Sequence, residues 1–133
     1  MTRFCDNGDG TVTDSTTSLQ WQRETDEVTR DYKLAEDYVH KLELGGHGDW
    51  RLPEKEELTD LALVENKQLE KVFPNLKRER YWANTKAQDL HWAENPKRIA
   101  YTVDFDPESG NYGKAIAYYN AFNYYVRAVR KAW

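Results

Sequence analysis

The sequence predicts an α+β fold, because the spacing of its apolar residues changes once along the chain. Over about residues 31–66, apolar residues recur every three to four positions, which is typical of helices. From residue 80 onwards they stand in short runs rich in Tyr, Val and Ile, separated by turn residues, as in strands. The 133 residues suit a single domain covering 1–133, without repeat or linker. We therefore expect two helices packed on a mainly antiparallel, twisted sheet.

The N-terminal residues 6–14 predict a turn rich in Gly and Asp that leads into a hairpin. Gly8 and Gly10 can adopt positive φ, which tight turns often require. Residues 11–13 have the pattern of a short strand, and residues 19–22 that of its partner. We expect this hairpin to join the sheet.

The first helix is predicted to begin after Asp31, an N-cap residue, and to end at Gly45–Gly46. Its apolar stripe consists of residues that recur every four positions, Leu34, Tyr38 and Leu42. Ala35 and Val39 widen this stripe.

The segment 49–53 is predicted to anchor the second helix in the core. Trp50 and Leu52 would point to one face of a short strand. Pro53 fixes φ near the helical value and lacks the amide that a first helical turn leaves unpaired. Glutamates follow at the positive end of the helix, which we expect to run to about Asn66.

Four strands are predicted in the C-terminal half, at residues 81–85, 99–105, 114–119 and 124–130. The last strand alternates, so that one face carries Tyr124, Val126 and Ala128 and the other carries Tyr125, Arg127 and Val129. Arg127 is expected either to pair with a buried acid or to bind ligand.

Four ordered motifs resemble one bacterial domain family. They are the opening at residues 3–22, the string WRLPxxxEL that begins at Trp50, the strand 81–85 and the closing strand 125–130. This pattern is similar to the family typified by the C-terminal domain of the Legionella collagen-like adhesin. The resemblance implies a C-type-lectin-like fold with adjacent termini, and binding of sulfated glycans by a trimer, as in the best-known member. It also implies an extracellular or cell-surface location.

Charge and cysteine content restrict the partners and the compartment. A net charge of -4 disfavours a general nucleic-acid or anionic-membrane binder, and no apolar run approaches the roughly 20 residues of a spanning helix. We therefore expect neither nucleic-acid binding nor membrane insertion. Cys5 stands alone, whereas relatives pair a cysteine in the first helix with one in the closing strand, at positions that resemble Tyr38 or Val39 and Ala128 here. The missing pair and the lack of a signal sequence leave a cytoplasmic location open.

The opening offers a candidate calcium site, and the sequence indicates no other cofactor. Asp and Asn oxygens suit a hard cation. An EF-hand is excluded, because placing Gly10 at its invariant glycine puts Cys5 and Thr16 at the two end ligands. The alternative is a turn whose side chains cap their own backbone. The candidate ligands are Asp6, Asn7, Asp9 and Asp14.

The sequence does not predict an enzyme. Cys5 is the only thiol, with no base marked for it, and no serine lies in a G-x-S-x-G turn. His40, His47 and His91 lack the spacing of zinc ligands.

A binding surface is predicted near the C-terminus, where tyrosines alternate with asparagines. Tyr offers a flat apolar ring and a hydroxyl, and Asn offers a donor and an acceptor, which together suit a glycan. The same surface would also suit a protein partner or a homo-oligomer, and alternate tyrosines could instead be core residues. With two basic residues added, the predicted site comprises Tyr112, Tyr118, Tyr119, Asn120, Asn123, Tyr124, Arg78 and Arg98.

Overall fold

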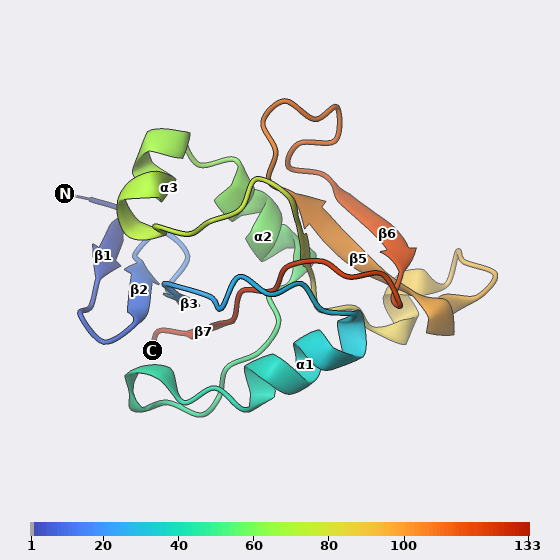
Figure 1. Ribbon diagram of the computed structural model, residues 1–133, viewed down its shortest axis with the longest axis horizontal. Coiled ribbons are helices and arrows are strands. Elements are labelled where there is room, and N and C mark those ends of the chain that lie inside the picture. The colour runs from blue at the N-terminus through green and yellow to red at the C-terminus, as the bar shows by residue number, and fades with distance from the viewer. Residues whose placement is uncertain (1) are drawn as a thin grey trace.

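The computed structural model describes residues 2–133, which form three α-helices and two antiparallel sheets (Figure 1). The α+β prediction is confirmed, and the arrangement is consistent with a C-type-lectin-like fold. None of the described helices has the length and apolar character needed to cross a bilayer.

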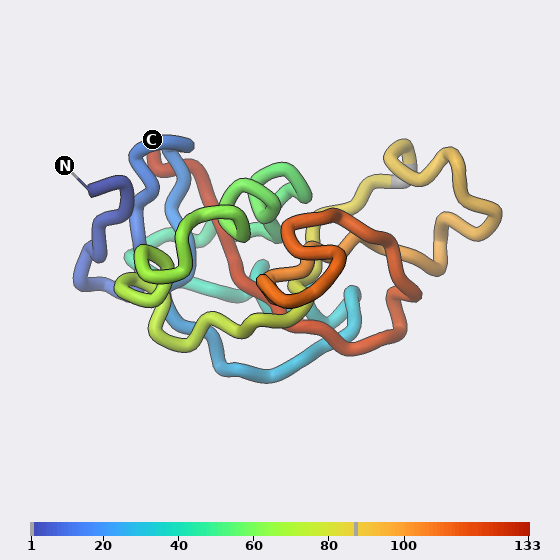
Figure 2. Tube along the Cα trace, turned by 90° about the horizontal axis from the view of Figure 1, so that it is seen from above, coloured from blue at the N-terminus to red at the C-terminus, as the bar shows by residue number. Residues whose placement is uncertain are grey.

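The first sheet contains the predicted hairpin and the end of the chain. Its strands are β1 (Phe4–Asp6), β2 (Thr11–Asp14), β3 (Leu19–Gln22) and β7 (Val129–Lys131), in the order β1-β2-β3-β7. Trp21 of β3 lies opposite Val12 on one side and Val129 on the other. This pairing brings the two termini to the same end of the molecule, as predicted (Figures 1 and 2).

The second sheet consists of β4 (Arg80–Trp82), β5 (Ile99–Asp104) and β6 (Ala115–Tyr119), in that order. The prediction of a single sheet is therefore wrong. The closing segment, predicted as one strand, links the two sheets: Tyr125 forms an isolated bridge with Tyr81, and only Val129–Lys131 pairs as β7.

Helix α1 (Tyr32–His40) begins as predicted, because the Asp31 carboxylate accepts the amide proton of Leu34 at 2.9 Å. It ends earlier than predicted, since Gly45 and Gly46 lie in a separate 3-10 turn, Leu44–Gly46. Gly45 has a φ of 61°, and a Cβ there would come within 3.0 Å of Asp9 and Thr11. This glycine therefore serves a close approach to the N-terminal turn.

The stripe of α1 is also rotated from the predicted one. Ala35 and Val39 are fully buried, whereas Leu34 is exposed. The helix therefore contacts the core mainly through Ala35 and Val39, and Tyr32 and Tyr38 pack beside them partly buried.

The predicted second helix corresponds to α2 (Lys55–Ala62), which ends before Asn66, and a third helix that was not predicted, α3 (Asn66–Val72), follows it. Glu54 caps α2, and its backbone N–H donates to the carboxylate of Glu57 at 2.7 Å, which completes a capping box. α2 packs on β5, the central strand of the second sheet (Figure 1).

Two clusters of buried side chains form the core, and the closing segment lies between them. Val126 and Ala128 belong to the cluster that contains Trp50, Leu52 and Trp82. Tyr125 and Val129 contact the other cluster, which includes Trp21, Leu58, Phe73 and Tyr81. The predicted alternation of the closing segment and the core positions of Trp50 and Leu52 are thus confirmed.

The segment between β4 and β5 projects from the body at the end opposite the termini, as the yellow trace in Figure 2 shows. It contains two 3-10 turns, Ala87–Leu90 and Pro96–Arg98, and the buried Leu90 anchors it.

Candidate ligand-binding groove

A groove of about 510 Å³ opens between this projecting segment and the end of the second sheet. The strand register sets its floor: Ile99 lies opposite Tyr119, and Tyr101 lies opposite Ala117, so these side chains share one face. Lys55 of α2 lies over the Tyr101 ring, at 4.2 Å from the ring centre, and the groove lies beyond Tyr101, over Ile99 and Ala117. The complete lining is Trp92, Ala93, Glu94, Asn95, Ile99, Ala117, Tyr118, Tyr119 and Phe122.

Trp92 forms one wall of the groove and is held in place by its indole nitrogen. Nε1 donates to the Asp89 carbonyl and to the Tyr101 hydroxyl, both at 3.1 Å. The side chain nevertheless remains 58% exposed. The ring is therefore oriented by the fold while its surface stays available to a ligand.

Tyr119 and Phe122 form the opposite wall. The amide of Phe122 donates to the Tyr119 carbonyl at 3.1 Å, which closes a tight turn after β6. The two rings meet edge to face at 5.7 Å and are 59% and 48% exposed. Large exposed aromatic side chains thus gather on both sides of one concave surface, which is typical of binding sites.

Polar residues surround this aromatic lining. Glu94 and Asn95 are exposed on the side of Trp92. Arg98 lies on the other side, where it lines a shallow depression with Tyr119 and Phe122. The groove therefore combines apolar rings with both charged and neutral polar groups.

The structure brings only part of the predicted surface to this groove. Tyr118 and Tyr119 line it, Arg98 adjoins it, and Asn123 is exposed in a neighbouring cleft. Arg78 lies elsewhere, because it pairs with Glu70 of α3.

Three predicted binding residues serve the fold instead. Tyr112 donates its hydroxyl proton to the carbonyl of Ala62 and packs on the core. The Asn120 side chain donates to the Lys97 carbonyl at 2.9 Å, which ties the turn after β6 to the projecting segment. Tyr124 packs edge to face on Trp82 at 5.2 Å. Each of these three side chains thus has a partner within the chain.

The neighbouring cleft, about 320 Å³, is lined by Thr29, Glu79, Arg80, Asn123, Tyr124 and Tyr125. Arg80 lies over the Tyr118 ring at 4.6 Å and pairs with Asp104 at 3.5 Å. Burial, and then the neighbouring Tyr118, raise the pKa of Tyr124. A tyrosine hydroxyl is protonated at neutral pH even at its ordinary pKa, so Tyr124 can act as a hydrogen-bond donor.

The predicted calcium ligands do not converge on one point. Asp14 lies opposite Phe4 at one end of the β1–β2 pair, whereas Asp6 lies opposite Val12 at the other. Asp14 is buried and accepts two hydrogen bonds of 2.8 Å from Arg3. The β2 strand thus separates Asp14 from the turn.

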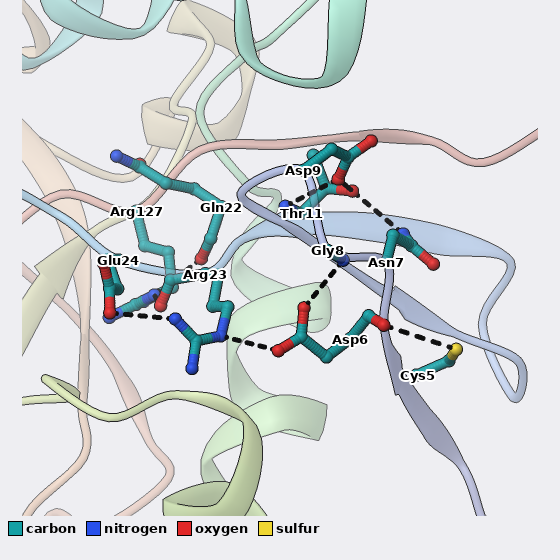
Figure 3. A network of polar contacts seen from close by, with 10 residues as sticks. All are labelled: Cys5, Asp6, Asn7, Gly8, Asp9, Thr11, Gln22, Arg23, Glu24 and Arg127. Atoms are coloured by element: carbon teal, nitrogen blue, oxygen red, sulfur yellow. Dashed lines mark hydrogen bonds and ion pairs between the residues drawn. The ribbon is translucent and has the colours of Figure 1, made fainter.

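The other three side chains are satisfied within the turn or by its neighbours (Figure 3). Asp6 pairs with Arg23 at 3.0 Å, Asn7 donates to the hydroxyl of Thr11 at 2.9 Å, and Asp9 accepts from the Thr11 amide at 3.1 Å. The opening is therefore built as the backbone-capping turn that the sequence offered as the alternative.

Arg127, which lies beside this network in Figure 3, is also structural. It is buried, donates to the carbonyls of Gln22 and Arg23 at 2.6 and 2.7 Å, and lies over the Phe73 ring at 5.1 Å. Neither predicted role, an acid partner or a ligand contact, describes this arrangement.

Comparison of the chain with known proteins identifies its family. The family model described as the Lcl C-terminal domain matches residues 10–130. The chain belongs to this family. No curated protein matches it. In this Lcl C-terminal domain the whole groove lies within the matched residues, whereas Asp6, Asn7 and Asp9 precede them.

Sequence reasoning missed Trp92, Ile99 and Phe122 as groove residues. Trp92 could have been recognised because it stands in a polar stretch without helical or strand periodicity. Such a stretch has no apolar face that would bury a tryptophan in the core. Phe122 stands between tyrosines within the predicted surface, but the prediction omitted it because it selected only Tyr, Asn and Arg residues. Ile99 could not be recognised, because its exposure depends on where α2 stops covering the sheet.

Proposed function

We propose that this Lcl C-terminal domain is a non-enzymatic module that binds a glycan in the groove between Trp92 and the pair Tyr119 and Phe122. The observation that carries the proposal is the convergence of these three exposed rings on one concave surface. Sugar rings present C–H groups that carry partial positive charge, and the face of an aromatic ring is negative. A hexose can therefore stack on these rings.

The polar groups at the rim support the same ligand class. Asn95 offers a donor and an acceptor to sugar hydroxyls, and the Arg98 guanidinium can hold a sulfate or carboxylate with two parallel hydrogen bonds. The family supports an adhesin-like role, and we extend it to an anionic glycan at the cell surface by analogy with the best-known member. That location is part of the proposal and rests on the family alone.

Binding without catalysis is supported by the chemistry of the lining. Among the described residues that line the groove, Glu94 alone carries a carboxylate. Most glycosidases need a pair of carboxylates that flank the bond to be cleaved. We therefore propose recognition and not hydrolysis.

A glycan array that includes sulfated oligosaccharides, followed by calorimetric titration of the strongest binder, tests this proposal. Trp92→Ala should weaken binding at least tenfold, equivalent to about 1.4 kcal/mol. Trp133→Ala is the matched control, because Trp133 is 79% exposed but does not line the groove. Equal binding by both variants would contradict the proposal.

A matched pair of arginine variants tests the proposed preference for an anionic glycan. Arg98→Gln should weaken binding of a sulfated glycan more than that of its desulfated form, and should reduce the dependence of affinity on salt. Arg78→Gln removes another exposed charge, one that pairs with Glu70 and does not line the groove, and should do neither. The same loss in both variants would show that the groove does not select the anionic group.

A further inference from the structure

The second sheet has an unprotected edge at β6. β6 is the outer strand in the order β4-β5-β6, and among the described residues no strand pairs with its far side. Its five residues, Ala115–Tyr119, include no charged residue and no proline. Natural proteins usually protect such an edge with lysine, proline or a bulge, because its backbone groups can pair with another chain.

The hydrogen-bond register shows which backbone groups face outwards. The amide of Asn120 donates to the Arg98 carbonyl at 2.8 Å, so this opposed pair is hydrogen-bonded. Hydrogen-bonded and non-hydrogen-bonded pairs alternate in an antiparallel ladder, so Tyr118 and Ile116 also bond towards β5. The N–H and C=O groups of Ala115, Ala117 and Tyr119 therefore point away from the sheet. The Tyr119 carbonyl already accepts one bond, from Phe122.

We propose that β6 pairs antiparallel with β6 of a second copy of this chain, about a two-fold axis at Ala117. In that register Ala117 faces the partner's Ala117, and Ala115 faces the partner's Tyr119. Every outward-pointing residue then meets another outward-pointing residue, so backbone hydrogen bonds can form on both sides of the axis.

Side-chain size fits the same register. The large ring of Tyr119 is placed opposite the small Ala115, and the two alanines meet at the centre, so one face of the strand pair closes without a clash. On the other face Ile116 lies opposite the partner's Tyr118, a combination of β-branched and aromatic residues that stabilises antiparallel pairs. This self-complementarity favours a second copy over an unrelated strand.

The dimer would join two three-stranded sheets into one of six strands. Directly opposed residues of an antiparallel pair lie on the same face, so both grooves would open on the same side. If the proposed function holds, one long glycan could engage both grooves and bind more tightly through avidity.

Charge substitution at the axis tests the pairing without any glycan, so its outcome is independent of the proposed function. Sedimentation velocity should show that the wild type dimerises. Ala117→Lys and Ala117→Glu should each weaken dimerisation at least about tenfold, because like charges meet across the axis. An equimolar mixture should dimerise again, because opposite charges then meet. A monomeric or trimeric wild type, unaffected variants or a mixture that fails to associate would each overturn the proposal.

A cross-link keeps the test valid if those variants fail to fold. In a Cys5→Ser background, Ala117→Cys should form a disulfide-linked dimer on mild oxidation, since residue 117 faces its own copy at a Cα separation of about 5.5 Å. Lys114→Cys is the control, because it is exposed beside the same strand but does not face itself. Equal cross-linking of the two variants would contradict the register.

Discussion

The sequence offers the N-terminal opening and the tyrosine-rich C-terminal region as binding candidates, but the structure uses the side chains of the opening and of the aromatic groove in opposite ways. In the opening, the carboxylates and amides of residues 6–14 find partners within the chain. In the groove, the rings of Trp92, Tyr119 and Phe122 remain largely exposed although their positions are fixed.

This difference shows that residue type alone does not identify a site. A polar side chain that already bonds its own backbone would have to give up those bonds to take a ligand. A ring that is oriented by the fold but uncovered loses little on binding, because its conformational entropy is already reduced. Ligand binding is therefore expected where the fold leaves oriented groups without a partner.

The largest expected effect is on stability, in the opening. Asp14→Ala should lower the free energy of unfolding by about 2–4 kcal/mol, because it leaves Arg3 and Thr17 without their buried acceptor. Asp9→Ala, which removes an exposed carboxylate from the turn that precedes β2, should cost less. Urea denaturation of both variants measures this difference. Equal losses would mean that burial does not determine the role of these carboxylates.

The Asp14 carboxylate should also make the stability of the fold depend on pH. Burial favours its neutral form, but the hydrogen bonds from Arg3 and Thr17 outweigh burial, and the pKa of the Asp14 carboxyl lies below its usual value. A lowered pKa stabilises the folded state above the unfolded-state pKa of about 3.9, and this contribution disappears as pH falls through the folded-state pKa. Asp14→Asn should therefore lose less stability than the wild type between about pH 5 and pH 2. Parallel curves of melting temperature against pH would contradict this explanation.

Two asparagines of the predicted surface provide a sharper comparison. Asn120→Ala should cost about 1 kcal/mol, because it removes the bond to the Lys97 carbonyl, whereas exposed Asn123→Ala should cost less than about 0.5 kcal/mol. Thermal melts decide between them. If Asn120→Ala were neutral, the projecting segment would be held by other contacts.

The smallest expected effect is that of calcium. Only binding to the folded state raises the melting temperature, and the candidate ligands do not converge, so millimolar Ca²⁺ should change it little. A rise of several degrees that EDTA reverses and Asp9→Ala abolishes would show that the opening binds metal after all.

Local features of this fold could be predicted from the sequence because their causes lie within a few residues. The Asp31 cap, the hairpin at Leu19–Gln22 and the buried anchor at Trp50 each depend on neighbours along the chain. The split into two sheets could not be predicted. It depends on the closing segment leaving Tyr81 to reach Trp21, a contact between residues far apart in sequence.

The site was predictable only in part for the same reason. Tyr119 and Arg98 were found by residue type, but the roles of Tyr112 and Asn120 depend on the carbonyls of Ala62 and Lys97, which only the fold brings near. Trp92 is oriented by its bond to the Tyr101 hydroxyl, a contact between the projecting segment and β5 that the residue pattern does not reveal.

If the ligand lies against Trp92, its binding should change the surroundings of that indole ring. The most direct measurement follows the indole N–H signals of the five tryptophans by NMR during titration with the best-binding glycan. The Trp92 signal should shift strongly, whereas those of buried Trp21, Trp50 and Trp82 and of exposed Trp133 should move little. A titration that reaches saturation while the Trp92 signal stays in place would contradict the assignment of the groove as the binding site.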